Sequence, residues 1–359
     1  MQLVGPKGLR AMVRVQMMAT ATFTSFRWRV DELHREAGRE EEDQRAGKPW
    51  RHFSETFSLQ MHPCELPGVD VAPSAGPVQG LRQWSIPPTP VSTPASKDWT
   101  AVAAELAHGV MCVGYAFQEA HHAGKLDAQA AKARIETEEN RMHHGVKSIK
   151  ALARLFGELK AGKSVEVKEG GIVRHLQPED VVSPPRPGRL VAVLGDSSDS
   201  RAMAPLCVCA DLLVHEATNA PLGAENIAAV TAKTIEHGHS TPAMAGAFAA
   251  ACGVRKLLLT HFSSRYGGDE SNEEHVEVMR QVTKLARAEF GSAQEEDGED
   301  GDDSRVAAAY DLLRVNVPAN AAGEPRVEMI AEARQAAAEA AAAAAQRFAQ
   351  LVASHDASS

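Results

Sequence analysis

The fold of this chain is decided by three stretches: LVAVLGDSS (190–198), LLVHEAT (212–218) and KLLLTHFSS (256–264). In each stretch a short run of apolar residues leads directly into polar and turn-forming residues. Such runs are typical of strands that are buried on both faces, and the segments between them have a helical composition. The pattern therefore predicts a strand–helix–strand–helix–strand unit and an α/β protein.

The last helix of this unit has clear signals at both ends. Ser240 or Thr241 can cap its N-terminus, and Pro242 suits the first helical position. Gly253 can end the helix in a left-handed conformation. The sequence therefore predicts a helix over residues 242–252.

Chemically capable side chains stand at the ends of the predicted strands and just before this helix. They are Asp196, Glu216, His239 and His261. In layered α/β folds, ligands bind outside the strand ends, where loops present side chains from a rigid support. We therefore expect these side chains to converge.

Several strings of the sequence, in this order, resemble the C-terminal half of ribonuclease Z. They are GDSSDS (195–200), ADLLVHEAT (210–218), HGHSTPAMAGAFA (237–249) and LLLTHFSSRY (257–266). Upstream, HGVMCVGY (108–115) and GPKGL (5–9) resemble further segments of the same family. Members of this family are tRNA 3′-processing endonucleases of the metallo-β-lactamase fold. The resemblance implies an α/β fold, a metallo-β-lactamase-like αββα sandwich with insertions.

The resemblance also implies a site with two zinc ions, in which His108, Asp196 and His261 bind metal. A carboxylate such as Asp196 can bridge two ions, and each imidazole can serve one of them. Glu216 and His239 are expected to be catalytic, because a carboxylate can orient a ring whose proton reaches the leaving 3′-oxygen.

Each of these residues also has a purely structural interpretation. Asp196 can cap a helix, Glu216 can accept backbone amides in a turn, and a histidine can pack at a strand or helix end. Arg265 is expected to contact a substrate phosphate, with a structural salt bridge as the alternative. The order of the residues on one supersecondary unit favours the functional interpretation.

The principal metal motif of the family, HxHxDH, does not occur in the sequence. GPKGL normally follows this motif, so the resemblance implies that the chain starts after it and that the sandwich is N-terminally incomplete. Three ligands divided between two ions leave each ion under-coordinated, because a catalytic zinc usually has three protein ligands. We therefore expect weak zinc binding and slow or no cleavage by this chain.

The resemblance predicts one partial domain over residues 1–318, followed by an Ala-rich helical tail over residues 319–359. Charge runs and prolines predict disordered insertions at about 31–51, 64–97 and 294–304. A Lys- and Arg-rich region at about 119–187 is expected to be an RNA-binding arm, although SIKA (148–151) replaces the Gly-Pro pair of the family. An amphipathic surface helix is the alternative there.

Composition sets limits on the class of protein. The chain of 359 residues has a net charge of −9, so RNA recognition would have to be concentrated in one basic patch. We expect no membrane span, because no run of about 18 strongly apolar residues occurs. The five cysteines lack a CxxC pair, and their odd number favours reduced thiols and an intracellular location. Cytoplasm, nucleus and organelle all remain open.

The leading hypothesis is therefore a zinc-dependent phosphodiesterase that resembles the endonuclease removing 3′ trailers from precursor tRNA. Precursor tRNA is the expected partner, and the resemblance also allows a homodimer. Two alternatives stay open: a non-catalytic RNA-binding or partner subunit, and another metallo-β-lactamase-fold hydrolase acting on a small ester or thioester.

Overall fold

The structure, a computed structural model, describes residues 1–35, 60–76, 82–88, 99–267, 271–291, 305–321 and 326–356. The insertion predicted at about 294–304 lies outside the described residues, as does most of the one at 31–51. The chain forms two compact units. Unit 1 consists of Met1–Glu119, Leu190–Val317 and Ile330–Ser359, and unit 2 of Ala120–Arg189 and Pro318–Met329.

Unit 1 is built around an eight-stranded mixed sheet with the strand order β13-β12-β11-β10-β7-β6-β5-β4. The strands are β4 (Ser74–Ala75), β5 (Arg82–Ser85), β6 (Trp99–Leu106), β7 (Cys112–Glu119), β10 (Leu190–Leu194), β11 (Leu212–Glu216), β12 (Leu257–Thr260) and β13 (Val306–Ala308). β10 to β13 are parallel to one another, whereas β4 to β7 and the β7–β10 pair are antiparallel. The predicted α/β class and the three predicted strands are confirmed.

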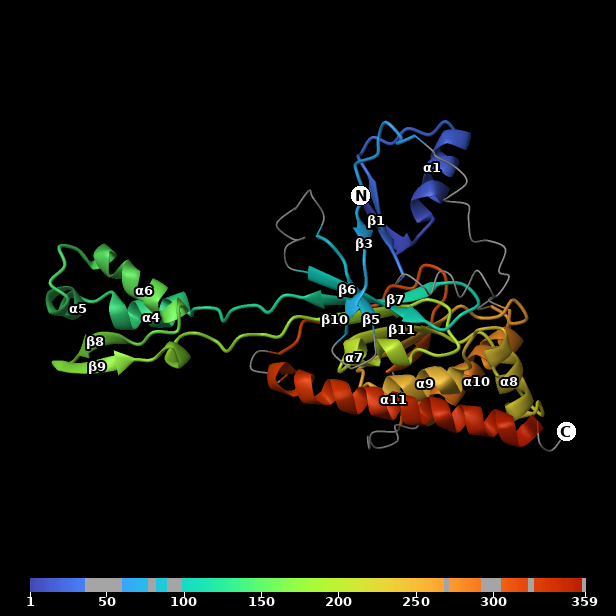
Figure 1. Cartoon of the computed structure of the whole chain (residues 1–359). Helices are drawn as coiled ribbons and strands as arrows, with labels where there is room; N and C mark the ends of the chain where they lie inside the picture. The colour runs from blue at the N-terminus through green and yellow to red at the C-terminus, as the bar shows by residue number, and fades with distance from the viewer. Residues whose placement is uncertain are drawn as a thin grey trace. The chain divides into compact units, whose positions relative to one another are not determined.

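Helices cover one side of this sheet (Figure 1). They are α7 (Ala204–Cys207), α8 (Ile227–Glu236), α9 (Pro242–Ala251), α10 (Glu273–Phe290) and α11 (Arg326–Asp356), with a 3₁₀ turn at Arg201–Met203. The core contains Leu213 and Leu257 of the sheet together with Phe248 of α9 and Val282 of α10. Gly246 allows α9 to approach α10 closely, because a Cβ there would lie 2.1 Å from the Ala286 carbonyl oxygen.

The predicted helix 242–252 is confirmed as α9, which ends one residue earlier. Thr241 caps it, since its hydroxyl accepts a hydrogen bond from the Met244 amide at 3.3 Å. Gly253 follows the helix with a φ of 59°, the left-handed conformation that favours glycine. These local signals fix where α9 starts, and hence where the residues before it lie.

A second, three-stranded parallel sheet in unit 1 contains β1 (Gln2–Pro6), β2 (Arg29–Leu33) and β3 (Asp70–Val71), next to helix α1 (Leu9–Ala19). β3, β4 and β5 all lie in the region 64–97, which we predicted to be a disordered insertion. The prediction is wrong for the residues that form these three strands. Strands of two to four residues are too short for a periodic signal, and their partners, β2 and β6, are supplied by tertiary packing.

Unit 2 has its own small core. Unit 2 contains α4 (Ala128–Ile135), α5 (Glu138–His143), α6 (Ala153–Lys160), the hairpin of β8 (Val165–Glu169) and β9 (Ile172–Leu176), and 3₁₀ turns at Ile149–Leu152 and Pro178–Asp180. Gly170 and Gly171 form the hairpin turn with φ values of 59° and 83°, which suit glycine. Ile135, Leu152 and Leu176 are fully buried in this core.

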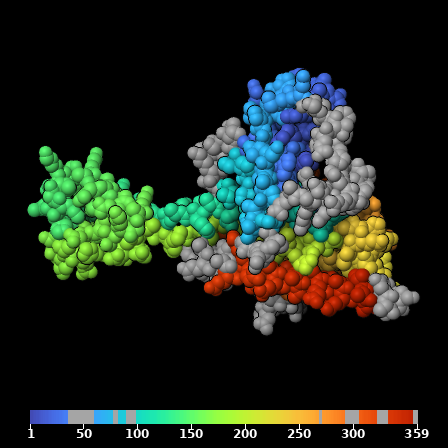
Figure 2. Space-filling model, in the orientation of Figure 1, coloured from blue at the N-terminus to red at the C-terminus, as the bar shows by residue number. Residues whose placement is uncertain are grey.

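The Ala-rich tail forms α11, a helix of 31 residues whose surface is the red strip in Figure 2. Ala341 belongs to the main core of unit 1, and Phe348 is buried as well. The tail is therefore packed on unit 1 rather than merely appended to it. Among the described helices, α11 included, none has the length and apolar character needed to cross a membrane.

Candidate functional site

The predicted site residues lie at one edge of the large sheet. Asp196 comes two residues after β10, Glu216 is the last residue of β11, and His261 directly follows β12. Because these three strands are parallel neighbours, their carboxyl ends meet at the same edge. His108 joins them from the loop between β6 and β7, and His239 from the turn before α9.

Three of these side chains form a compact group. His108, Asp196 and His239 each offer a ligand atom, and these atoms lie within 4.8 Å of one another. The imidazole ring of His239 stands between two other rings, with centroid distances of 5.0 Å to His108 and 5.3 Å to His261. The structure thus brings together residues that are up to 153 positions apart in the sequence.

His261 is close to Asp196 as well as to His239. Its Nε2 is 3.4 Å from Oδ2 of Asp196, and about half of its side chain is exposed. Its backbone has a φ of 56°, an uncommon conformation for a residue with a Cβ. Such conformations cluster at functional sites, where the surrounding structure holds them in place.

Glu216 and His239 form a direct pair. Nδ1 of His239 lies 3.0 Å from Oε1 of Glu216, whose side chain is only 1% exposed. The same oxygen accepts the Ser197 amide at 2.7 Å, while Oε2 accepts the Thr218 hydroxyl at 2.5 Å and the Thr218 amide at 3.2 Å. The carboxylate thus acts as an acceptor on all sides, and the ring nitrogen facing it carries the proton.

Thr218 is a residue that the sequence analysis missed. Besides its two bonds to Glu216, its hydroxyl oxygen lies 3.3 Å from Nδ1 of His239. It therefore contacts both members of the pair and fixes the orientation of the carboxylate. Its position two residues after Glu216, at the end of a strand, is the only signal that could have indicated it.

His108 is oriented by the backbone at Gly238, a second contact that the sequence did not predict. Nδ1 of His108 lies 2.8 Å from the Gly238 carbonyl oxygen. Gly238 has a φ of 82°, and a Cβ there would lie 2.6 Å from this Nδ1. Only glycine fits both the conformation and the close contact.

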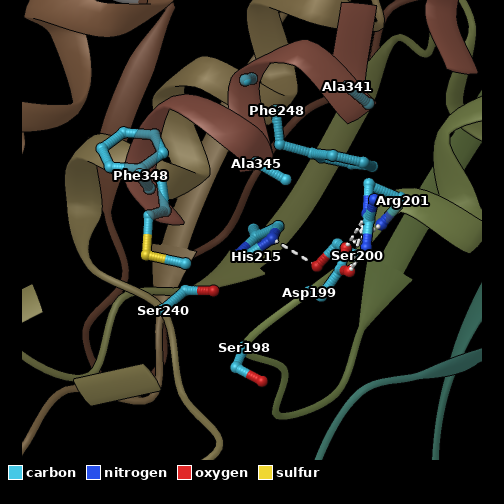
Figure 3. Close-up of a pocket in the computed structure, with 12 residues that line it drawn as sticks. Ser198, Asp199, Ser200, Arg201, His215, Ser240, Phe248, Ala341, Ala345 and Phe348 are labelled. Carbon is cyan, nitrogen blue, oxygen red and sulfur yellow. Dashed lines mark hydrogen bonds and ion pairs between the residues drawn. The ribbon is translucent and has the colours of Figure 1, made fainter. Parts of the chain in front are cut away.

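His215 lies behind the site, in the lining of a small pocket (Figure 3). It is 1% exposed, its Nδ1 donates to the Glu216 carbonyl oxygen at 2.7 Å, and its Nε2 lies 2.9 Å from the Ser200 hydroxyl. Burial lowers the pKa of this imidazole. His215 is therefore held neutral and connects β11 to the loop that carries Asp196. Phe348 of α11 lines the same pocket.

Cys112 is a further neighbour of the site. Its Sγ would lie 2.7 Å from a Cβ on Gly195, so glycine is needed beside it. Burial and the nearby charge of Asp196 raise the pKa of this thiol. The thiol therefore stays protonated near neutral pH, which makes it a poor metal ligand compared with the imidazoles.

Arg265 is engaged in contacts with neighbouring protein groups. Its guanidinium pairs with Glu225 at 3.0 Å and donates to the Ala220 carbonyl oxygen and the Tyr266 hydroxyl. They agree with the alternative interpretation of Arg265, a structural salt bridge. A phosphate at Arg265 would have to compete with the carboxylate of Glu225.

The donor set fits a divalent ion of the zinc type. Imidazole nitrogens and a carboxylate oxygen are its usual protein ligands, and three of them define a catalytic site with an open position. A second group within the described residues, Glu32, His34 and Asp70, offers one imidazole and two carboxylates. There the guanidinium of Arg10 pairs with Glu32 at 3.5 Å and with Asp70 at 2.7 Å. The positive charge of Arg10 therefore already occupies the position that a metal ion would take.

Fold and site define an α/β protein with a candidate His/Asp metal centre at the carboxyl edge of its sheet. No family model matches the chain. It is 38% identical over 168 residues to ribonuclease Z of Streptococcus suis (strain 98HAH33), covering 47% of each chain. It is 36% identical over 167 residues to ribonuclease Z of Limosilactobacillus reuteri (strain DSM 20016), covering 46% of each.

These relatives confirm the resemblance to ribonuclease Z, and the chain spans about half the length of the curated relatives it matches. Among solved structures, human tRNase Z, short form, is similar with 21% identity and a TM-score of 0.42, covering 88% of this chain and 68% of that one. The metallo-β-lactamase fold protein YhfI from Bacillus subtilis has 15% identity and a TM-score of 0.34, covering 83% and 69%.

Proposed function

We propose that this chain is a metal-dependent phosphodiesterase of the ribonuclease Z type, which acts on the 3′ trailers of precursor tRNA. The observation that carries the proposal is the convergence of His108, Asp196, His239 and His261 with the buried Glu216 at one sheet edge. The names of the curated relatives support the substrate class.

The proposed roles follow from the geometry. His108, Asp196 and His261 would hold zinc, which supplies a Lewis acid for the phosphate oxygens and an activated water. Glu216 keeps the proton on Nδ1 of His239 and directs Nε2 away from itself. With RNA bound, a protonated His239 can then deliver the Nε2 proton to the leaving 3′-oxygen.

Unit 2 is proposed to be the RNA-binding arm at about 119–187. Residues 120–189 contain thirteen Lys and Arg against nine Asp and Glu, whereas the whole chain has a net charge of −9. Positive charge that neutralises phosphates supplies most of the sequence-independent affinity for RNA. Eight of these cations are exposed: Lys125, Lys132, Lys147, Lys150, Arg154, Lys160, Lys163 and Arg174.

A homodimer is proposed as well. Helix α1 and the loop after it expose four large apolar side chains, Met12, Met18, Phe23 and Phe26. Exposed apolar surface of this kind favours association. Light scattering should give twice the chain mass for the wild type and a lower mass for Met12→Glu with Phe23→Glu.

The activity is tested with the purified chain, zinc and a precursor tRNA labelled at its 5′ end. We expect a labelled product with a shortened 3′ end, and loss of that product with a chelator. Asp196→Asn should lower the rate by more than about 10²-fold, because it removes the carboxylate between the histidines. Asp199→Asn is the matched control in the same loop, where Asp199 pairs with Arg201 outside the cluster. Cleavage that needs neither metal nor Asp196 contradicts the proposal.

We propose that cleavage by this chain alone is slow. At the carboxyl edge of the large sheet, the described residues offer one group of three metal ligands plus His261, whereas two-metal chemistry needs a ligand set for each ion. The same observation favours a second candidate, an RNA-binding partner that does not cleave. Precursor tRNA bound by the zinc-loaded chain without any product would support that candidate.

A further inference from the structure

We infer that His239 is the third ligand of a single metal ion in the RNA-free protein, together with His108 and Asp196. The inference rests on the proposed function only in sharing its site, and it gives His239 a task beyond proton transfer. It also changes the composition of the site: one ion held by three side chains of this chain, rather than three ligands divided between two ions.

The first argument is distance. The ligand atoms of His108, Asp196 and His239 lie within 4.8 Å of one another. Around a tetrahedral zinc with bonds of about 2.0–2.1 Å, ligand atoms lie roughly 3.3 Å apart. Small side-chain rotations therefore suffice to close the group around an ion, without movement of the strands that carry it.

The second argument is the way both rings are held. Nδ1 of His108 faces the Gly238 carbonyl oxygen at 2.8 Å, and Nδ1 of His239 faces the Glu216 carboxylate at 3.0 Å. Both acceptors require the proton on Nδ1, so Nε2 of each ring keeps a free lone pair. A carbonyl or carboxylate behind the imidazole is the arrangement that metal-binding histidines usually have.

His261 lacks this arrangement. Among the described residues, its Nδ1 has no hydrogen-bond partner, and its side chain is 49% exposed against 18% for His239. A ring without such support loses more rotational freedom on binding a metal. His261 therefore ranks behind His239 as a ligand in the RNA-free protein, although its Nε2 stays close to Asp196.

The two tasks of His239 exclude each other at any one moment. A lone pair given to a metal cannot carry a proton, so proton transfer requires Nε2 to be released when RNA is bound. The inference therefore concerns the protein without RNA, and that is the state in which it is tested.

The test is zinc affinity of the full chain without RNA, measured by competition with a chromophoric chelator. We expect a stoichiometry of one, and a loss of affinity of at least about 10-fold in His239→Ala, similar to His108→Ala. His261→Ala should lose less than His239→Ala. His237→Ala is the matched control, because His237 is exposed in the same turn and outside the cluster. Affinity within twofold of the wild type in His239→Ala overturns the inference.

A measurement on the wild type guards against a variant that fails to fold. In the chain with ¹⁵N-labelled histidine, one equivalent of zinc should shift the Nε2 signals of His108 and His239, while their Nδ1 protons are retained. An unshifted Nε2 of His239 in the zinc complex also overturns the inference. Both experiments omit RNA, so a chain that binds zinc in this way but leaves precursor tRNA intact contradicts only the proposed function.

Discussion

Nδ1 of His239 lies 3.0 Å from Oε1 of Glu216, and the two residues come from different elements 23 positions apart. The carboxylate is buried and accepts three further hydrogen bonds, from Ser197 and Thr218. A charge buried to this degree is tolerated because each oxygen is hydrogen-bonded. The pair therefore presents His239 to the site in one tautomer, whichever task the ring performs.

Replacing Glu216 by glutamine should destabilise the chain. An amide has only one acceptor oxygen, so either the Ser197 amide or the Thr218 amide faces an NH₂ group and loses its partner. One buried unsatisfied donor costs about 1–3 kcal/mol. Urea unfolding of Glu216→Gln should show this loss, and Glu225→Gln, at a partly exposed carboxylate, should stay within about 0.5 kcal/mol of the wild type. Equal stability of the two variants would contradict the described network.

Gly238→Ala should be more costly than an ordinary glycine substitution at positive φ. The left-handed conformation alone costs about 1–2 kcal/mol, and the new Cβ would also push against His108 Nδ1 at 2.6 Å. Gly253→Ala isolates the first effect, because its φ is 59° and nothing lies within 4 Å of the added carbon. The melting temperature of Gly238→Ala should therefore be lower than that of Gly253→Ala. Only Gly238→Ala should weaken zinc binding. The reverse ranking would show that His108 is not held as described.

Stability should fall with acid because of His215. Burial lowers the pKa of this ring in the folded chain below its ordinary value of 6.5. Below pH 6.5 the ring is therefore protonated in the unfolded chain but stays neutral in the folded chain. The free energy of unfolding is therefore unaffected by His215 above pH 6.5 and decreases as the pH falls below it, with a slope approaching about 1.4 kcal/mol per pH unit. Urea unfolding at pH 7.5, 6.5 and 5.5 should show this slope in the wild type and in His121→Gln, an exposed control, but less of it in His215→Gln. An unchanged slope in His215→Gln would assign the acid sensitivity to other groups.

The packing of α11 can be tested by placing a charge on its buried side. Ala341 is 2% exposed within the main core, so Ala341→Glu would bury an unpaired carboxylate and cost about 3 kcal/mol or more. Ala343, on the same helix, is exposed, and Ala343→Glu should change stability by less than about 0.5 kcal/mol. Chemical unfolding compares the two variants at equal helix propensity. If both are tolerated, α11 does not pack on unit 1.

The sequence determined the parts of this protein that depend on neighbours along the chain. Buried strands such as 190–194 appear as apolar runs, and α9 is marked by its cap at Thr241 and by Gly253. Parallel strands bring their carboxyl ends to one edge, so the side chains after β10, β11 and β12 could be placed together. The short strands β3 to β5 could not be predicted, because two to four residues carry no period and their pairing depends on distant partners.

Only the tertiary structure decided which atoms meet within the site. The bond from His108 to the Gly238 carbonyl oxygen joins residues 130 positions apart, and Thr218 reaches His239 across the gap between two elements. Such contacts depend on how the strands and helices pack, to within fractions of an ångström, and no local pattern encodes that packing. For the same reason the sequence indicated a catalytic role for His239 but not that its ring also lies among the candidate ligands of a metal ion.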